Sequence, residues 1–261
     1  MPEIDPKRLP FDKAIAYFRD KLQIPSDRWD VIWNEIADYA FAISGVTRAD
    51  LLNDLYQAIS QALEQGTTLQ QFVKDFDTIA ERRGWADGKG MGAYRKELIF
   101  SQNLRTAYAA GRYQQMTDSD VVKSRPYWVW KHRDSRNPRP AHLALHNKVF
   151  SFDDPFWQTG YPPCGFGCRC AVYALNDLDL QRRGLKVEDA PSETVTIRDR
   201  MTGQSQRVPA INGQPVAEPG FAHAPGSSPK EQRQAILDKA LDRLPDALRK
   251  QVVSEWRNSG S

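Results

Sequence analysis

Cysteine is scarce in this chain of 261 residues, and long apolar runs are missing. The three cysteines all lie between Cys164 and Cys170, which is too few and too close together for a disulfide framework. No run approaches the roughly 18 apolar residues of a membrane-spanning helix, so no membrane span is expected. Residues 1–6 lack the apolar core of a signal peptide, and synthesis in the cytoplasm is therefore expected.

A strong excess of one charge is also missing. The chain has 36 Lys and Arg against 33 Asp and Glu, a net charge of +3 that does not by itself require a nucleic-acid partner. The most basic stretch is 123–140, so any contact with a polyanion would be local. With 40% hydrophobic and 26% charged residues, the composition predicts a folded chain of one large or two small domains.

Apolar residues recur at helical spacing in the first ninety residues. The pattern predicts helices over 29–43, 51–63 and 72–79. In the second helix an aliphatic residue recurs every four positions: Leu51, Leu55, Ile59 and Leu63. Gly66 is expected to end that helix, and Thr68 to cap the next one. A glycine-rich joint then predicts a boundary near residue 90, before a long helix over 91–116.

Beyond this helix the spacing is typical of strands. Residues that favour strands predict short ones at 127–132, 148–150, 169–173, 193–197 and 206–208. Five prolines within 209–229 exclude a helix or an interior strand and predict an extended arm or surface wrap. Helical spacing returns after Pro229, with Pro245 separating two short helices.

These elements predict an α+β fold. Its expected parts are a helical N-terminal region (1–90), a central α+β domain with short antiparallel strands (91–208), a proline-rich arm (209–229) and a helical C-terminal tail (230–261). Trp128, Trp130 and Trp157 are expected to form the core of the central domain, because such large rings bury much apolar surface.

Histidines and cysteines gather within forty residues. The cluster comprises His132, Asp134, His142, His146, Cys164, Cys168 and Cys170. Zinc favours tetrahedral sets of thiolate and imidazole, and the two groups can meet if the intervening residues fold back as a loop. Joint ligation by the cysteines is expected to need a turn or irregular backbone, which Gly165 and Gly167 favour. Three interpretations stay open: a structural metal site, buried thiols with hydrogen-bonded histidines, and a redox pair.

Two enzymatic patterns are present only in part. The segment 142–146 has the histidine spacing of a zinc protease helix, but a leucine follows the first histidine where the general-base glutamate is needed. Pro163 and Cys164 are similar to the Pro-Cys of zinc deaminases, but three residues, not two, separate Cys164 from the next cysteine. Neither pattern supports an enzyme of its class.

Several short sequence motifs occur together, in a fixed order along the chain. They are Arg105-Thr106-Ala107-Tyr108, Trp130-Lys131-His132-Arg133-Asp134, Arg139-Pro140-Ala141-His142, Asp153-Asp154-Pro155-Phe156-Trp157, Gly167-Cys168-Arg169-Cys170 and Pro219-Gly220-Phe221. This order resembles the phage Mu F-like head morphogenesis family, the minor capsid proteins of tailed phages and prophages. The resemblance covers roughly residues 95–226.

The resemblance implies a non-enzymatic virion component that is made in the cytoplasm of a bacterial host. Its implied partners are the portal protein, the major capsid protein or both, and contact with packaged DNA stays open. On this hypothesis the apolar stripes of the helices at the two ends of the chain dock on portal or capsid subunits.

The resemblance also implies which residues a metal would use. If the family keeps a metal, structural zinc is the expected cofactor, and His142, Cys168 and Cys170 are the expected ligands. Asp134 or His146 would be the fourth ligand. The competing hypothesis is a metal-dependent hydrolase or nuclease, with His142, His146 and Asp134 around zinc and the basic stretch gripping phosphate.

Overall fold

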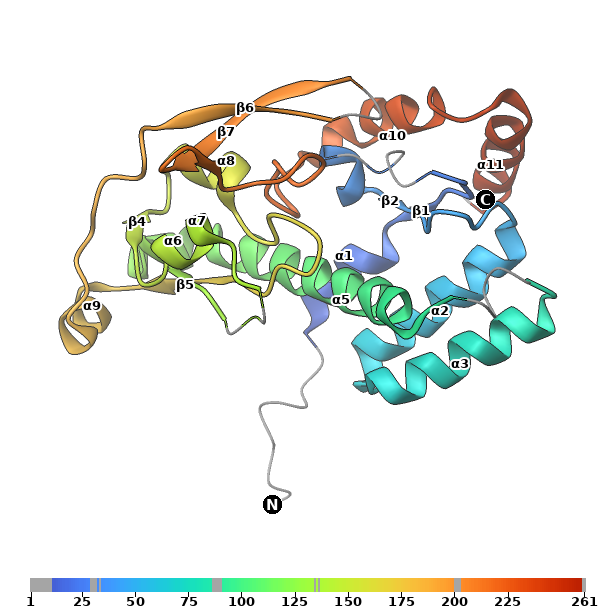
Figure 1. Cartoon of the computed structure of the whole chain (residues 1–261), viewed down its shortest axis with the longest axis horizontal. Helices are drawn as coiled ribbons and strands as arrows, with labels where there is room; N and C mark the ends of the chain where they lie inside the picture. Colours follow the sequence, from blue (N-terminus) through green and yellow to red (C-terminus); the bar gives the residue numbers. More distant parts are fainter. Residues whose placement is uncertain are drawn as a thin grey trace, which may run out of the picture. The chain divides into compact units, whose positions relative to one another are not determined.

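Two compact units make up the chain in a computed structural model (Figure 1). The structure describes residues 11–28, 32, 34–85, 91–133, 135, 137–199 and 203–259, with side chains up to 254. Unit 1 comprises Met1–Gly111 and Ser228–Ser261, and unit 2 comprises Arg112–Ser227. Helices occur together with short antiparallel sheets, which confirms the predicted α+β class. The boundaries expected near 90 and 208 lie away from this division, the one after 229 lies within two residues of it, and all three stay predictions.

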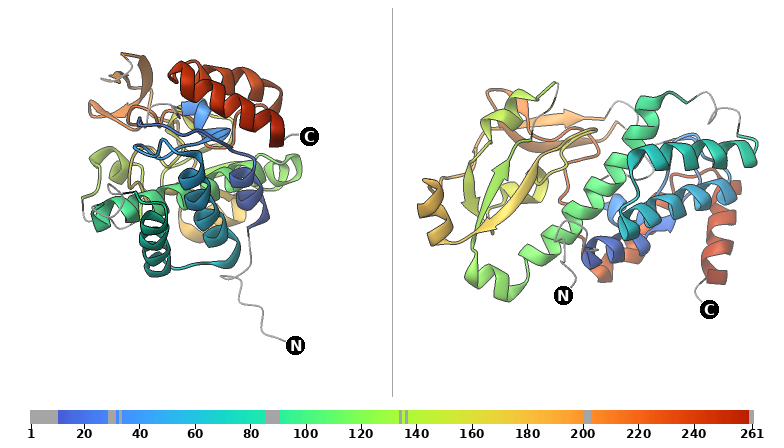
Figure 2. Two further views of the ribbon diagram at one scale, coloured as in Figure 1. Left: turned by 90° about the vertical axis from the view of Figure 1, so that its right-hand side faces the viewer. Right: turned by 90° about the horizontal axis from the view of Figure 1, so that it is seen from below.

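The first helices of unit 1 pack through their apolar stripes. They are α1 (Asp12–Arg19), α2 (Ala49–Gln65), α3 (Leu69–Arg82) and the first part of α5 (Ala93–Met116). Helices α2 and α3 lie side by side (Figure 2). The four aliphatic residues of the α2 stripe are all buried in one core. As predicted, Gly66 ends α2 in a left-handed conformation, and the Thr68 side chain accepts a hydrogen bond from the backbone N–H of Gln71 at 3.2 Å.

The predicted helix over 29–43 is wrong where the structure describes that range. The described part contains the 3-10 helix η2 (Asn34–Asp38) and strand β2 (Ala40–Phe41), which pairs in parallel with β1 (Leu22–Gln23). Asn34 has a φ of 46°, which an α-helix does not accommodate. Ile36 and Tyr39 are buried against the C-terminal helices, so tertiary packing accounts for the apolar pattern.

The C-terminal tail is part of the core of unit 1. It forms η3 (Lys230–Gln232), α10 (Arg233–Leu241) and α11 (Asp246–Ser259), and Pro245 lies between the two α-helices as predicted. Ile236, Leu237 and Leu241 are buried in one cluster with Ile24 and Ile36. The stripes of α2 and of the tail are thus covered within unit 1, and the prediction that these stripes dock on another protein is wrong.

Unit 2 contains two three-stranded sheets, and all five predicted strands are present. The first sheet has the order β4–β3–β5, with β3 (Tyr127–Lys131) antiparallel to both β4 (Val149–Ser151) and β5 (Ala171–Leu175). The second contains β6 (Thr194–Arg198), β7 (Ser205–Ile211) and β8 (Gln214–Pro215). The helices are α6 (Ser119–Ser124), α7 (Pro140–Ala144), α8 (Phe156–Gly160) and α9 (Asp177–Arg183), besides the end of α5.

Aromatic rings form the core between the first sheet and its helices. Trp128, Trp130 and Trp157 are all buried, as predicted. Trp128 packs on Trp157 with ring centroids 5.4 Å apart and on Tyr161 at 5.8 Å. Asp154, expected to start a turn before α8, accepts a hydrogen bond from the backbone N–H of Phe156 at 2.8 Å.

The proline-rich segment 209–229 begins in β7, the central strand of the second sheet, so the exclusion of an interior strand is wrong for residues 209–211. The rest of the segment packs into unit 2. Val216, Ala217, Ala222 and Ala224 are buried. Within the part of the chain that the structure describes, no helix is both long enough and apolar enough to cross a membrane.

Candidate metal centre

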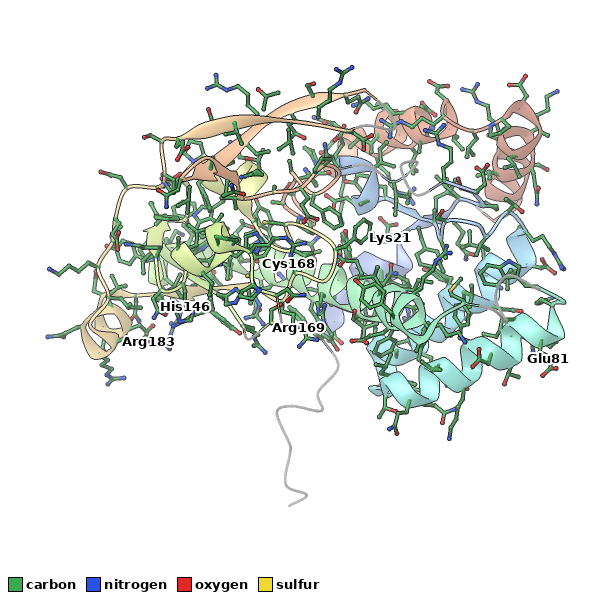
Figure 3. The ribbon with its side chains drawn as sticks, viewed as in Figure 1. Lys21, Glu81, His146, Cys168, Arg169 and Arg183 are labelled. Atoms are coloured by element: carbon green, nitrogen blue, oxygen red, sulfur yellow. The ribbon has the colours of Figure 1, made fainter. Side chains whose placement is uncertain are left out.

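Three of the predicted ligands meet in unit 2. The Nδ1 or Nε2 atom of His142 and the Sγ atoms of Cys168 and Cys170 all lie within 4.8 Å of one another. His142 comes from α7, whereas both cysteines come from the loop that joins α8 to β5; Cys168 is labelled in Figure 3. The histidine-bearing and thiol-bearing segments therefore come together in space, as the sequence analysis required.

The loop turns sharply so that both sulfurs reach the same place. Gly167 has a φ of +70°, and the backbone N–H of Cys168 donates to the carbonyl of Gly165 at 3.1 Å. This irregular backbone precedes β5, so both cysteines lie outside the regular strand. Gly165 is glycine for a steric reason, because a Cβ there would lie 2.4 Å from the Glu218 carboxylate.

The same loop is tied to the segment that follows β8. Arg139 donates from Nε and from Nη2 to one oxygen of Glu218, at 2.8 and 2.6 Å, and Nη2 also donates to the carbonyl of Phe166 at 3.0 Å. The backbone N–H of Glu218 donates to the carbonyl of Cys164 at 2.9 Å. These bonds hold the thiol-bearing loop against the residue that precedes α7.

His142 is oriented by a main-chain carbonyl. Pro140 starts α7, where its missing N–H costs nothing, and this places His142 on the buried side with 2% of its surface exposed. Its Nε2 lies 2.8 Å from the carbonyl oxygen of Val216. Because a carbonyl can only accept, Nε2 carries the proton, and Nδ1 faces the sulfurs of Cys168 at 3.8 Å and Cys170 at 3.6 Å.

The two sulfurs are close enough to share a proton. The hydrogen bond from Cys170 holds the pKa of Cys168 well below its ordinary value; burial opposes this, and His142 adds to the lowering. The pKa of Cys170 is raised by the same hydrogen bond and by its own burial. A lowered thiol pKa favours the thiolate, which is the form that binds a metal.

A further histidine lies beside this group of three. His132, directly after β3, has its Nδ1 at 3.5 Å from the Sγ of Cys170. The Nδ1 of His146 instead accepts a hydrogen bond from the backbone N–H of His132 at 3.2 Å. Asp134 lies outside the described residues. Sequence reasoning noted His132 in the cluster but did not choose it as a ligand.

A signal for His132 was present in the strand pattern. Side chains alternate along a strand, so Trp128, Trp130 and His132 share one face. Trp130 packs edge-on against the His142 ring, with centroids 5.5 Å apart. The alternation therefore places His132 on the side where His142 lies.

Cys164 is not in the three-residue group. It is fully buried, and its thiol donates to the carbonyl of Gly160 at 3.4 Å. Burial raises its pKa well above the ordinary value.

Comparison with known proteins places this region within a described family. The model of the family described as "Phage Mu protein F like protein" matches residues 53–173, a range that contains all the histidines and cysteines discussed above. The chain is 34% identical to the "Putative capsid assembly protein F" of Escherichia phage Mu, over 97% of this chain and 62% of that protein. It is 32% identical to the "Mu-like prophage FluMu F protein" of Haemophilus influenzae, over 84% of this chain and 57% of that protein.

The chain thus spans about three fifths of the length of these two relatives. No solved structure matches it.

Proposed function

Because the chain belongs to the phage Mu F-like family, we propose that it is a head morphogenesis protein of a tailed phage or prophage. The observation that carries this proposal is the 34% identity, over nearly the whole chain, to a relative whose name states a role in capsid assembly. On this proposal the chain is a minor component of the virion that binds the portal protein or the inner face of the capsid.

The buried state of the His and Cys cluster supports a role without catalysis. Hydrolytic zinc sites keep one coordination position open to water, whereas structural sites are closed. Here His142 and Cys168 are 2% and 3% exposed. A pocket of about 430 Å³ in unit 2 is lined by residues such as Lys148, Glu188 and Asn212, and none of the cluster residues lines it. This arrangement does not favour the competing hydrolase or nuclease hypothesis.

The test is incorporation into heads. Co-expression of the full chain with the portal and major capsid proteins of the same phage or prophage should yield heads that retain the chain through density-gradient purification in moderate salt. Pairwise pull-downs with each subunit across a salt series would then identify the partner, because screening weakens charged contacts while apolar docking persists. Heads that assemble fully without retaining the chain would refute the proposal.

A further inference from the structure

We propose that His132, His142, Cys168 and Cys170 form a closed tetrahedral zinc site in unit 2. This inference goes beyond the proposed function, because binding to a capsid requires no metal. It also replaces the sequence-based fourth ligand, Asp134 or His146, with His132.

Three donor distances agree with the edges of a zinc tetrahedron. With Zn–S near 2.3 Å and Zn–N near 2.0–2.1 Å, neighbouring sulfur and nitrogen ligands lie about 3.6 Å apart. The three N···S distances here are 3.5 Å for His132 with Cys170, 3.6 Å for His142 with Cys170 and 3.8 Å for His142 with Cys168. The donor atoms of His142, Cys168 and Cys170 already lie within 4.8 Å of one another, and His132 reaches this group through Cys170.

The surroundings support metal ligation. Metal-binding histidines donate their other ring N–H to a carbonyl or carboxylate, and His142 does so toward Val216. The indole Nε1 of Trp130 is buried without a hydrogen-bond acceptor within the described residues, and its ring packs on His142. An indole N–H near a pair of metal-bound thiolates would gain an acceptor that neutral thiols offer only weakly.

Charge balance favours the same ligand set. Two thiolates neutralise one Zn²⁺, so the complete site is neutral and can be buried without an unpaired charge. A disulfide between Cys168 and Cys170 would use neither imidazole. The set of two sulfurs and two imidazoles is one that structural zinc sites commonly use.

The site would link three separate segments of unit 2. His132 directly follows β3, His142 lies on α7, and the cysteines lie on the loop before β5. Through its hydrogen bond to the Val216 carbonyl, His142 also contacts the segment after β8. Zinc would therefore stabilise unit 2 by joining segments that are distant in the sequence.

The first experiment measures metal content. The full chain, expressed with added zinc and dialysed against metal-free buffer, should retain about one zinc per chain by elemental analysis. Removal of zinc by a strong chelator should lower Tm, and re-addition should restore it. Cobalt-loaded protein should show the intense visible absorption of tetrahedral Co²⁺ and the near-ultraviolet charge-transfer band of thiolate ligands. A metal-free chain with unchanged Tm, or a chain whose mass shows a Cys168–Cys170 disulfide after anaerobic purification, would overturn the proposal.

Matched variants assign the ligands. Cys168→Ser and Cys170→Ser should each reduce the thiolate band and lose zinc on dialysis, whereas Cys164→Ser should keep both. His132→Ala should weaken zinc binding by at least about 10-fold, and His146→Ala should leave it within about 2-fold of the unchanged chain. If a cysteine variant does not fold, the His132→Ala and His146→Ala variants still separate the alternatives, because His132 is half-buried and His146 is exposed. Their zinc affinities can be measured by competition with a chromophoric chelator. Equal affinity of the His132→Ala and His146→Ala variants, or loss of zinc in Cys164→Ser, would contradict the assignment.

Discussion

Two polar side chains that lie away from water donate hydrogen bonds to main-chain carbonyls. In unit 2, the His142 ring donates to Val216. In unit 1, Lys21 donates to the carbonyl of Ala37 and, at 3.2 Å, to the hydroxyl of Tyr17 (Figure 3). Burial lowers the pKa of Lys21 to about 8, and the nearby Asp38 and Asp20 carboxylates oppose the shift only in part.

Lys21 should give the folded chain a measurable pH dependence. Its pKa is about 8 in the folded chain against an ordinary value of 10.5. Between these values the unfolded chain binds more protons, so this residue makes the free energy of unfolding rise with pH, by at most about 1.4 kcal/mol per pH unit. Urea unfolding at pH 8, 9 and 10 should show this rise in the unchanged chain and a flatter profile for Lys21→Met.

Lys239→Met is the control for that measurement, because Lys239 is an exposed lysine paired with Glu35 at 3.2 Å. It should keep the slope of the unchanged chain. Parallel profiles for the unchanged chain and Lys21→Met would show that Lys21 is not destabilised in its protonated form.

Elements that are distant in the sequence pack into the same hydrophobic core. The helix α10 covers Ile24, Ile36 and Tyr39, residues that lie about two hundred positions earlier in the chain. The carbonyl of Ser228 accepts a hydrogen bond from the Tyr39 hydroxyl at 2.8 Å. The backbone N–H of Ser228 donates to the Asp38 carboxylate at 3.1 Å. The C-terminal helices are therefore structural parts of unit 1.

Leu237→Ala should test this packing. Leu237 on α10 is fully buried, so removal of its side chain should lower the free energy of unfolding by about 2–5 kcal/mol. The same substitution at Leu178 on α9, which is 49% exposed, should change it by less than about 0.5 kcal/mol. Chemical denaturation measures both values. A similar small effect at the two leucines would mean that α10 does not contribute to the core.

The whole molecule combines a helical unit with an α+β unit through one continuous helix. Helix α5 begins in unit 1 and continues into unit 2 beyond Gly111. A Cβ at Gly111 would lie 2.7 Å from the backbone nitrogen of Ala14, so glycine allows α1 to approach α5 closely. The net charge of +3 over 261 residues gives the molecule as a whole little electrostatic attraction to nucleic acid.

The full chain should not cleave DNA. Supercoiled plasmid incubated with the zinc-loaded protein, or with Mg²⁺ or Mn²⁺ added, should stay supercoiled in gel electrophoresis, because His142 and Cys168 are buried and the four proposed ligands leave no open coordination position. A double His142→Ala/His146→Ala variant serves as the control for contaminating nuclease. If the wild-type chain nicks the plasmid and the double variant does not, the result would instead support the hydrolase hypothesis.

Local patterns predicted most elements, and the family resemblance indicated three of the converging residues. Helical and strand spacing and the positions of glycine and proline are local properties, so the α+β class and the five strands were predictable. The mixture of His and Cys left several interpretations open, and the resemblance selected His142, Cys168 and Cys170, which the structure brings together. The apolar residues in 29–43 misled the helix prediction because their burial depends on α10, which follows about two hundred residues later.

Only the tertiary structure decided which surfaces are covered and which groups complete the site. The tail stripe packs inside unit 1, His132 approaches Cys170, and Val216 orients His142. The physical reason is that side-chain proximity across a fold depends on how the chain turns between its elements. No local pattern in the sequence encodes a distance between residues that are dozens of positions apart.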